Sequence, residues 1–146
     1  MKVAVTGATG FNGGHLVREL ARRGHTVTAL VRGSSNLAAI QKYITEAHTC
    51  DLTDSSSLVP FLSNAEALIN VVTLGTGLGP SLVEAAQEAG VARVVFTSTT
   101  GIFTTLNPSS KAIRLTAEKT ITESTLDYTI LRPTMIYGTP ADRNMW

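Results

Sequence analysis

Short apolar runs alternate with amphipathic segments along the whole chain. The runs are almost continuously apolar, which is typical of strands that are buried on both faces of a parallel sheet. The segments between them carry apolar residues at helical spacing, as Leu16, Val17 and Leu20 illustrate. The pattern predicts strands over residues 2–6, 27–31, 46–50, 67–72, 91–97 and 128–131, and helices over 12–23, 36–43, 54–62, 79–90 and 107–123.

This order of elements predicts an α/β fold in one domain, residues 1–146. Strands that alternate with helices favour a doubly wound parallel sheet, with helices on both faces in three α/β/α layers, as in the Rossmann fold. The glycine-rich segment 73–79 follows a predicted strand at the edge where such sheets bind ligands. We expect a flexible loop there, which either contacts a ligand or only connects two elements.

A glycine-rich motif, Thr6-Gly7-Ala8-Thr9-Gly10-Phe11-Asn12-Gly13, joins the first predicted strand to the first helix. Gly7 permits a tight turn, and Gly10 lets the main chain approach a pyrophosphate closely. Gly13 allows the helix to pack tightly. The N-terminus of that helix then offers unpaired N–H groups to the phosphates, so the motif predicts a dinucleotide site.

Charge and cysteine content exclude several classes of function. The net charge of +1 gives no electrostatic reason to expect nucleic acid or a membrane surface. No apolar run reaches the about 18 residues that a membrane span needs, and the first residues are too polar for a signal peptide. Cys50 is the only cysteine, which we expect to be a buried, inert thiol. We therefore expect a cytoplasmic protein without a metal site.

Three motifs resemble one known superfamily. The glycine motif, Asp51-Leu52-Thr53-Asp54, and Leu131-Arg132-Pro133 followed by Tyr137-Gly138 resemble the extended and atypical short-chain dehydrogenase/reductases, in particular their NAD(P)-dependent epimerase/dehydratase-like branch. The resemblance implies a nicotinamide dinucleotide cofactor. It assigns Gly7, Thr9, Gly10, Phe11, Asn12 and Gly13 to the pyrophosphate, Asp51 and Leu52 to the adenine, Val72 and Thr73 to the adenosine ribose, and Ser98, Thr99 and Pro133 to the nicotinamide.

The second predicted strand ends at Arg32, which bears on the choice of cofactor. Sites for NAD usually place an acidic residue here, and this chain has none between Glu19 and Glu46. A guanidinium can pair with the 2′-phosphate of NADP. The sequence therefore favours NADP(H), with NAD(H) left open, unless Arg32 is only a solvated surface residue.

The catalytic pair of the superfamily, a tyrosine four residues before a lysine, is missing. Alignment with the family places Ser110 and Arg114 at these two positions. Arg114 stays charged and could hold a ribose hydroxyl, alone or facing an anion together with Lys111. Hydride could pass to an acceptor that needs no strong acid, such as a quinone. Alternatively, Thr99, Ser110 or water transfers the proton, or the domain binds the cofactor without catalysis.

We therefore expect an NADP(H)-binding oxidoreductase or a nucleotide-sugar epimerase/dehydratase-like enzyme with an atypical active site and an unknown small-molecule substrate. A non-catalytic NADP(H) sensor and an interaction subunit with a vestigial loop are the alternatives, and a homo-oligomer stays open. The resemblance implies a substrate lobe after the sixth strand, so we expect this chain to be a fragment, a truncated gene product or a natural small version that recruits a partner. Trp146 at the end of the chain would need a surface to pack on.

Overall fold

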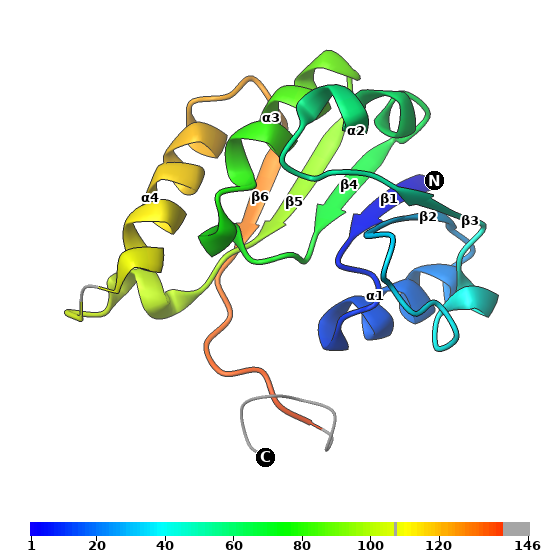
Figure 1. The fold of residues 1–146 in the computed structure, drawn as a ribbon, viewed down its shortest axis with the longest axis horizontal. Coiled ribbons are helices and arrows are strands. Elements are labelled where there is room, and N and C mark those ends of the chain that lie inside the picture. The colour runs from blue at the N-terminus through cyan, green and yellow to red at the C-terminus, as the bar shows by residue number, and fades with distance from the viewer. Residues whose placement is uncertain (107, 139–146) are drawn as a thin grey trace.

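A six-stranded parallel sheet forms the centre of the protein in the computed structural model, which describes residues 1–106 and 108–138 (Figure 1). The strand order is β3-β2-β1-β4-β5-β6. The strands are β1 (Lys2–Thr6), β2 (Thr26–Val31), β3 (Glu46–Thr49), β4 (Ala67–Asn70), β5 (Arg93–Thr97) and β6 (Tyr128–Leu131). The helices are α1 (Phe11–Arg22), α2 (Ser55–Leu62), α3 (Gly79–Glu88) and α4 (Ser109–Thr122). The expected doubly wound α/β fold is confirmed.

The strand β1 lies at the point where the order of the sheet reverses. Val3 of β1 pairs with Val27 of β2 on one side and with Ala67 of β4 on the other. The chain leaves β1 toward β2 and β3, crosses back to β4, and continues to β6. The carboxyl ends of β1 and β4 are therefore adjacent, while the loops that follow them diverge. This arrangement opens a crevice at the position where doubly wound sheets bind ligands.

The helices cover the two faces of the sheet unequally (Figure 1). The helices α2, α3 and α4 share one apolar core with the sheet residues Ala4, Leu68 and Phe96, all fully buried. On the other face, α1 and the segment around Ile40 pack on β1 and β2.

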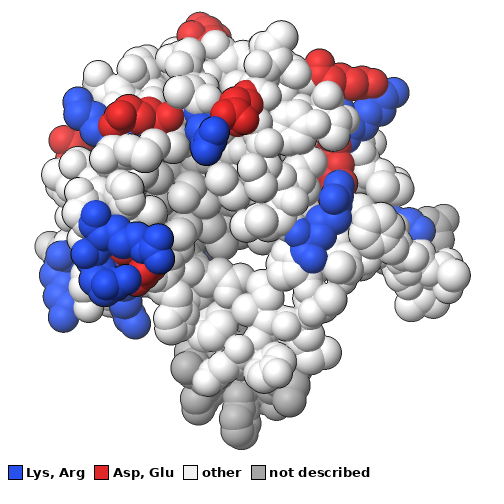
Figure 2. All heavy atoms as spheres, turned by 180° about the vertical axis from the view of Figure 1, so that it is seen from behind, with Lys and Arg blue, Asp and Glu red and all other residues white. Residues whose placement is uncertain are grey.

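The half of that second face over β5 and β6 is open within the described residues. Leu131 of β6 is 51% exposed there, and the centre of this side is hollow and uncharged, with charged side chains toward its edges (Figure 2).

Two segments differ from the sequence prediction. Residues 36–43 do not form the expected helix and contain only a 3₁₀ helix at Gln41–Tyr43. Ile40 is already buried in the core beside α1, so a longer helix is not needed to bury it. Residues 73–79 are more ordered than a flexible loop. A 3₁₀ helix at Leu74–Thr76 buries Leu74 and is capped by the Thr73 hydroxyl, which accepts a hydrogen bond from the amide of Gly75.

The other elements lie close to their predicted bounds. Asp54 caps α2 by accepting from the Ser56 amide, as expected, and Pro80 lies in the first turn of α3. Asn107 and Trp146, at which a helix start and a packing contact were expected, lie outside the described residues. Within the described residues, no helix combines the length and the apolar character that crossing a membrane requires.

Candidate functional site

A groove of about 1210 Å³ follows the carboxyl ends of β1, β2 and β4. Its walls come from the loops after these strands, from the start of α1 and from the segment after β3. The structure brings together in it eleven of the predicted cofactor residues: Gly7, Thr9, Gly10, Phe11, Asn12, Gly13, Arg32, Asp51, Leu52, Val72 and Thr73. The other two, Ser98 and Pro133, line a smaller neighbouring cavity.

The glycine loop has a shape that only glycine permits at two positions. Gly7 has a φ of +72°, in the left-handed region, and packs against Val72 after β4. A Cβ on Gly13 would lie 2.0 Å from the carbonyl oxygen of Gly7, which real structures do not tolerate. The loop and the first turn of α1 are therefore pressed together, as the motif predicted.

The first turn of α1 can accept an anion. Gly10 is the N-cap residue, and no side chain caps the helix. The amides of the first turn therefore point toward the groove with the positive end of the helix dipole behind them. These features fit the pyrophosphate of a dinucleotide, which needs closely approaching main chain and N–H donors.

The end of β2 supplies a cation to the same groove. Arg32 is exposed, lines the groove and forms no ion pair with any described residue. Its backbone amide donates to the Ser35 hydroxyl oxygen at 3.2 Å, which leaves the Ser35 proton available to a ligand. Asp51 also lines the groove, but its carboxylate accepts from the amide and the hydroxyl of Thr53 at 2.9 and 2.7 Å. These hydrogen bonds lower the pKa of Asp51.

A buried hydrogen bond joins the last residues of β1 and β4, directly before two of the loops that line the groove. The Thr6 hydroxyl donates to the Asn70 side-chain oxygen at 2.6 Å, and the Asn70 amide group donates to the Val72 carbonyl at 2.9 Å. Asn70 thereby fixes the segment that carries Val72 and Thr73 against β1. The sequence analysis missed Asn70, because an asparagine at a strand end gives no signal of its partner.

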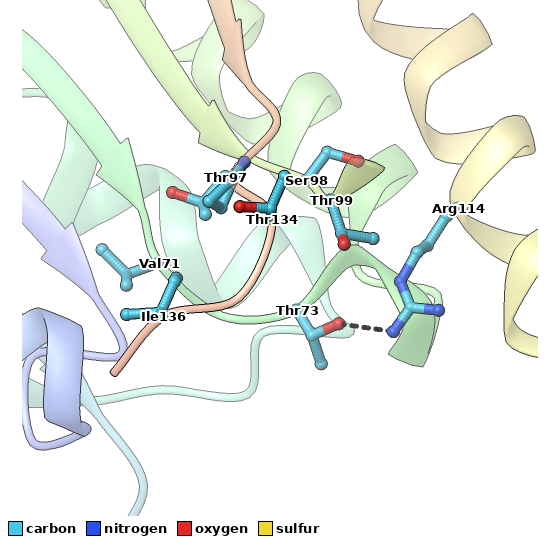
Figure 3. Close-up of a pocket in the computed structure, with 9 residues that line it drawn as sticks. Val71, Thr73, Thr97, Ser98, Thr99, Arg114, Thr134 and Ile136 are labelled. Carbon is cyan, nitrogen blue, oxygen red and sulfur yellow. Dashed lines mark hydrogen bonds between the residues drawn. The ribbon is translucent and has the colours of Figure 1, made fainter. Parts of the chain in front are cut away.

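A cavity of about 190 Å³ continues the groove past Val71, Thr73 and Ile136, which border both (Figure 3). Its walls are formed by the segments after β4, β5 and β6 and by α4. Ser98, Thr99 and Pro133, which were assigned to the nicotinamide, line this cavity together, and Thr97 and Thr134 add two hydroxyl groups. Arg114 reaches into the cavity from α4 (Figure 3).

Arg114 is held at both ends of its guanidinium. One nitrogen donates to the Ser110 hydroxyl oxygen at 2.7 Å, and another donates to the Thr73 hydroxyl oxygen at 3.4 Å. The structure thus brings the two residues at the catalytic-pair positions into contact. Lys111 does not join them, because its ammonium group donates to the Thr104 carbonyl at 2.7 Å.

An ion pair behind the cavity also escaped the sequence analysis. Two nitrogens of Arg132 contact the carboxylate of Glu118 at 2.6–3.1 Å, and the Glu118 side chain is only 9% exposed. Burial raises the pKa of Glu118, but the hydrogen bonds and the charge of Arg132 outweigh it, so the pKa is lowered. The Ser98 oxygen itself is buried and forms no hydrogen bond of ordinary geometry with any described residue.

The burial of Cys50 differs from the expectation. Cys50 is half-buried rather than buried, and it lines the groove beside Asp51. Burial and the charge of Asp51 raise the pKa of its thiol, which keeps it protonated and weakly reactive. Residues 1–106 and 108–138 contain no group of three His, Cys, Asp or Glu side chains that could hold a metal ion.

Comparison with known sequences agrees with this geometry. A family model described as NAD(P)H-binding matches residues 7–145. Sterol demethylase protein B of Methylococcus capsulatus is 36% identical over 118 residues, which cover 69% of this chain and 35% of that protein. Photosystem II assembly factor Ycf39 of Synechocystis is 29% identical over 143 residues, 90% of this chain and 44% of that protein. The chain therefore spans less than half the length of these relatives.

Solved structures share the fold. A wide-type short-chain dehydrogenase/reductase from Veillonella parvula in complex with NADP has a TM-score of 0.78 at 23% identity, covering 95% of this chain and 71% of that one. UDP-glucose 4-epimerase from Thermotoga maritima has a TM-score of 0.76 at 19% identity, covering 90% and 55%. With its glycine loop, its strand order and the family model that matches almost its whole length, the chain belongs to the NAD(P)H-binding family.

Proposed function

We propose that this protein is an NADP(H)-dependent oxidoreductase whose active site works without a strong protein acid. The observation that carries the cofactor preference is Arg32, a cation in the groove without an ion-pair partner among the described residues. Within residues 1–106 and 108–138, Asp51 is the one carboxylate that lines the groove, and it already accepts two hydrogen bonds from Thr53. A 2′-phosphate would therefore meet Arg32 and the Ser35 hydroxyl, both suited to an anion.

The residues of the site divide into two sets in this proposal. The glycine loop and the first turn of α1 bind the pyrophosphate, Asp51 and Leu52 border the adenine, and the segment after β4 borders a ribose. Ser98, Thr99 and Pro133 border the nicotinamide in the small cavity. The cofactor, when bound, supplies a hydride. The chain supplies hydroxyl groups and the guanidinium of Arg114 around the acceptor.

The site offers no strong acid to donate a proton to the acceptor. Ser110 stands where a phenol would donate it, and a serine hydroxyl has a far higher intrinsic pKa than a phenol. Acceptors that take their proton from water after the hydride arrives, such as quinones, suit these residues better than simple ketones do.

A non-catalytic NADP(H) sensor is the second candidate. It is favoured by the same serine at the acid position, and one of the relatives is named as an assembly factor rather than as an enzyme. One measurement tests the cofactor preference that both candidates share, and a second separates the enzyme from the sensor. Fluorescence titration with NADPH and NADH tests the cofactor, and equal affinities would contradict the proposed preference. Oxidation of NADPH with panels of quinones and carbonyl compounds tests turnover, and its absence with every acceptor would favour the sensor.

A further inference from the structure

Among the described residues, Arg114 is the only cation that lines the small cavity, and no described carboxylate lines it. The nearby acid, Glu118, is paired with Arg132. The other hydroxyl side chains that line the cavity belong to Thr73, Thr97, Thr99 and Thr134, whereas the hydroxyl oxygen of Ser98 is buried. A cavity with one fixed positive charge and several hydroxyl donors attracts an anionic oxygen group.

The surrounding residues hold the Arg114 side chain in one position. A Cβ on Gly75 would lie 2.9 Å from the central carbon of the guanidinium, so Arg114 occupies space that the glycine leaves free. Its contacts with Ser110 and Thr73 hold it from two sides. Since a guanidinium has five N–H donors, three remain for a ligand.

The neighbouring hydroxyls are also free to donate. The Ser110 oxygen accepts a hydrogen bond from Arg114, and the Thr99 oxygen accepts one from the Gly101 amide at 3.1 Å. The proton of each hydroxyl is therefore not used in these contacts. A planar carboxylate fits a guanidinium with two parallel hydrogen bonds, which a neutral carbonyl compound cannot match.

The two ends of the cavity are lined by different kinds of residue. Val71 and Ile136 lie at one end of the cavity and Arg114 at the other, while Thr73, which also borders the groove, lies beside Arg114 (Figure 3). A nicotinamide that enters from the groove would leave the Arg114 side for the second reactant. The volume of about 190 Å³ is below the about 300–1,000 Å³ typical of small-molecule sites, so the reactant must be small.

We infer that the Arg114 side of this cavity binds the carboxylate of a small organic acid. That the acid is the substrate rests on the proposed function, whereas its binding can be measured separately. Arg114 is then an anchor for the substrate and takes no part in the proton transfer.

The test is a ¹H–¹⁵N NMR titration of the full chain, first with NADP⁺ and then, at saturating NADP⁺, with acetate and pyruvate. Acetamide and pyruvamide are the neutral controls of the same shape, and inorganic phosphate is the control for a general anion site. We expect the two acids to shift the signals of Thr99 and of the Arg114 side chain, and to bind at least about tenfold more tightly than their amides.

Three variants locate the binding. Arg114→Gln should weaken the acids about ten- to a hundredfold and change NADP⁺ affinity less than about threefold. Gly75→Ala keeps the charge but displaces the guanidinium, so it should also weaken the acids. Lys119→Gln removes an exposed cation of the same helix and should change neither affinity.

Equal binding of acids and amides would overturn the inference, as would acid binding that survives Arg114→Gln. Phosphate that binds as tightly as the acids would also overturn it, in favour of a general anion site. A comparable loss of NADP⁺ affinity in Arg114→Gln would make Arg114 a ribose ligand instead. If NADP⁺ does not bind at all, the proposed function fails. The same acid and amide titrations on the cofactor-free chain then decide the inference by the same criteria.

Discussion

Two nitrogens of Arg132 donate hydrogen bonds to the carboxylate of Glu118 at 2.6–3.1 Å. These bonds link the residue that follows β6 to α4. Pro133 and Thr134, which line the small cavity, follow directly in the chain. The ion pair therefore sets the distance between two walls of the cavity without lining it.

This pair predicts a stability that depends on pH. Because the pKa of Glu118 is lower in the folded protein than the about 4.3 of an unfolded glutamate, the pair stabilises the fold at neutral pH. That contribution is lost as the pH falls below about 4.3 through the folded pKa. Glu118→Gln should lower the free energy of unfolding by about 1–3 kcal/mol at pH 7 and by much less at pH 3. Urea unfolding at both pH values measures the difference.

Glu123→Gln is the control for this experiment. Glu123 forms only an exposed pair with Lys119 at 3.8 Å, so its loss should cost less than about 0.5 kcal/mol at either pH. A loss of the same size in both variants would show that the burial of Glu118 has no special effect.

Alanine substitutions at two adjacent glycines of α1 should have opposite effects on the protein. Gly13→Ala places a methyl group 2.0 Å from the Gly7 oxygen, so the loop must open and cofactor binding should be lost. Gly14→Ala meets nothing closer than Ile40 at 3.9 Å, and alanine should stabilise the helix by about 0.5–1 kcal/mol. Thermal unfolding and NADPH titration of both variants check this. Normal NADPH binding by Gly13→Ala would contradict the proposed phosphate site.

The cofactor preference depends on one side chain. Arg32→Ala should reduce the preference for NADPH over NADH by about 1.5–3 kcal/mol, the value of a charge-assisted hydrogen bond. Arg93→Ala is the matched control, because Arg93 pairs with Asp127 and does not line the groove. Calorimetric titration with both cofactors measures the preference. An unchanged ratio of affinities in Arg32→Ala would exclude Arg32 as the residue that recognises the phosphate.

Ser110 should contribute little to the chemical step. If water supplies the proton, Ser110→Ala should lower the single-turnover rate of quinone reduction by less than about tenfold, whereas removal of a true general acid costs about 10²–10⁴-fold. Thr116→Ala, an exposed change on the same helix, serves as the control. A loss of more than a hundredfold in Ser110→Ala alone would establish Ser110 as the proton donor.

The glycine loop could be predicted from the sequence because its constraints are local. Gly7 and Gly13 are needed by contacts within one short segment and with the strand end beside it. The buried links could not be predicted in the same way. Thr6 and Asn70 are 64 residues apart, and Glu118 and Arg132 are 14 apart, so no periodic pattern identifies them as partners. The segment 36–43 misled the prediction because Leu37 and Ile40 have helical spacing but need only one turn to be buried.

The buried hydrogen bond between Thr6 and Asn70 couples the ends of β1 and β4, from which two loops of the groove start. The loop after β1 cannot open without breaking this bond or moving the segment after β4, which Asn70 holds through Val72. A ligand that contacts only the glycine loop should therefore slow hydrogen exchange at amides beyond β4 as well. Protection from exchange would spread across β1 and β4 even for a fragment as small as pyrophosphate.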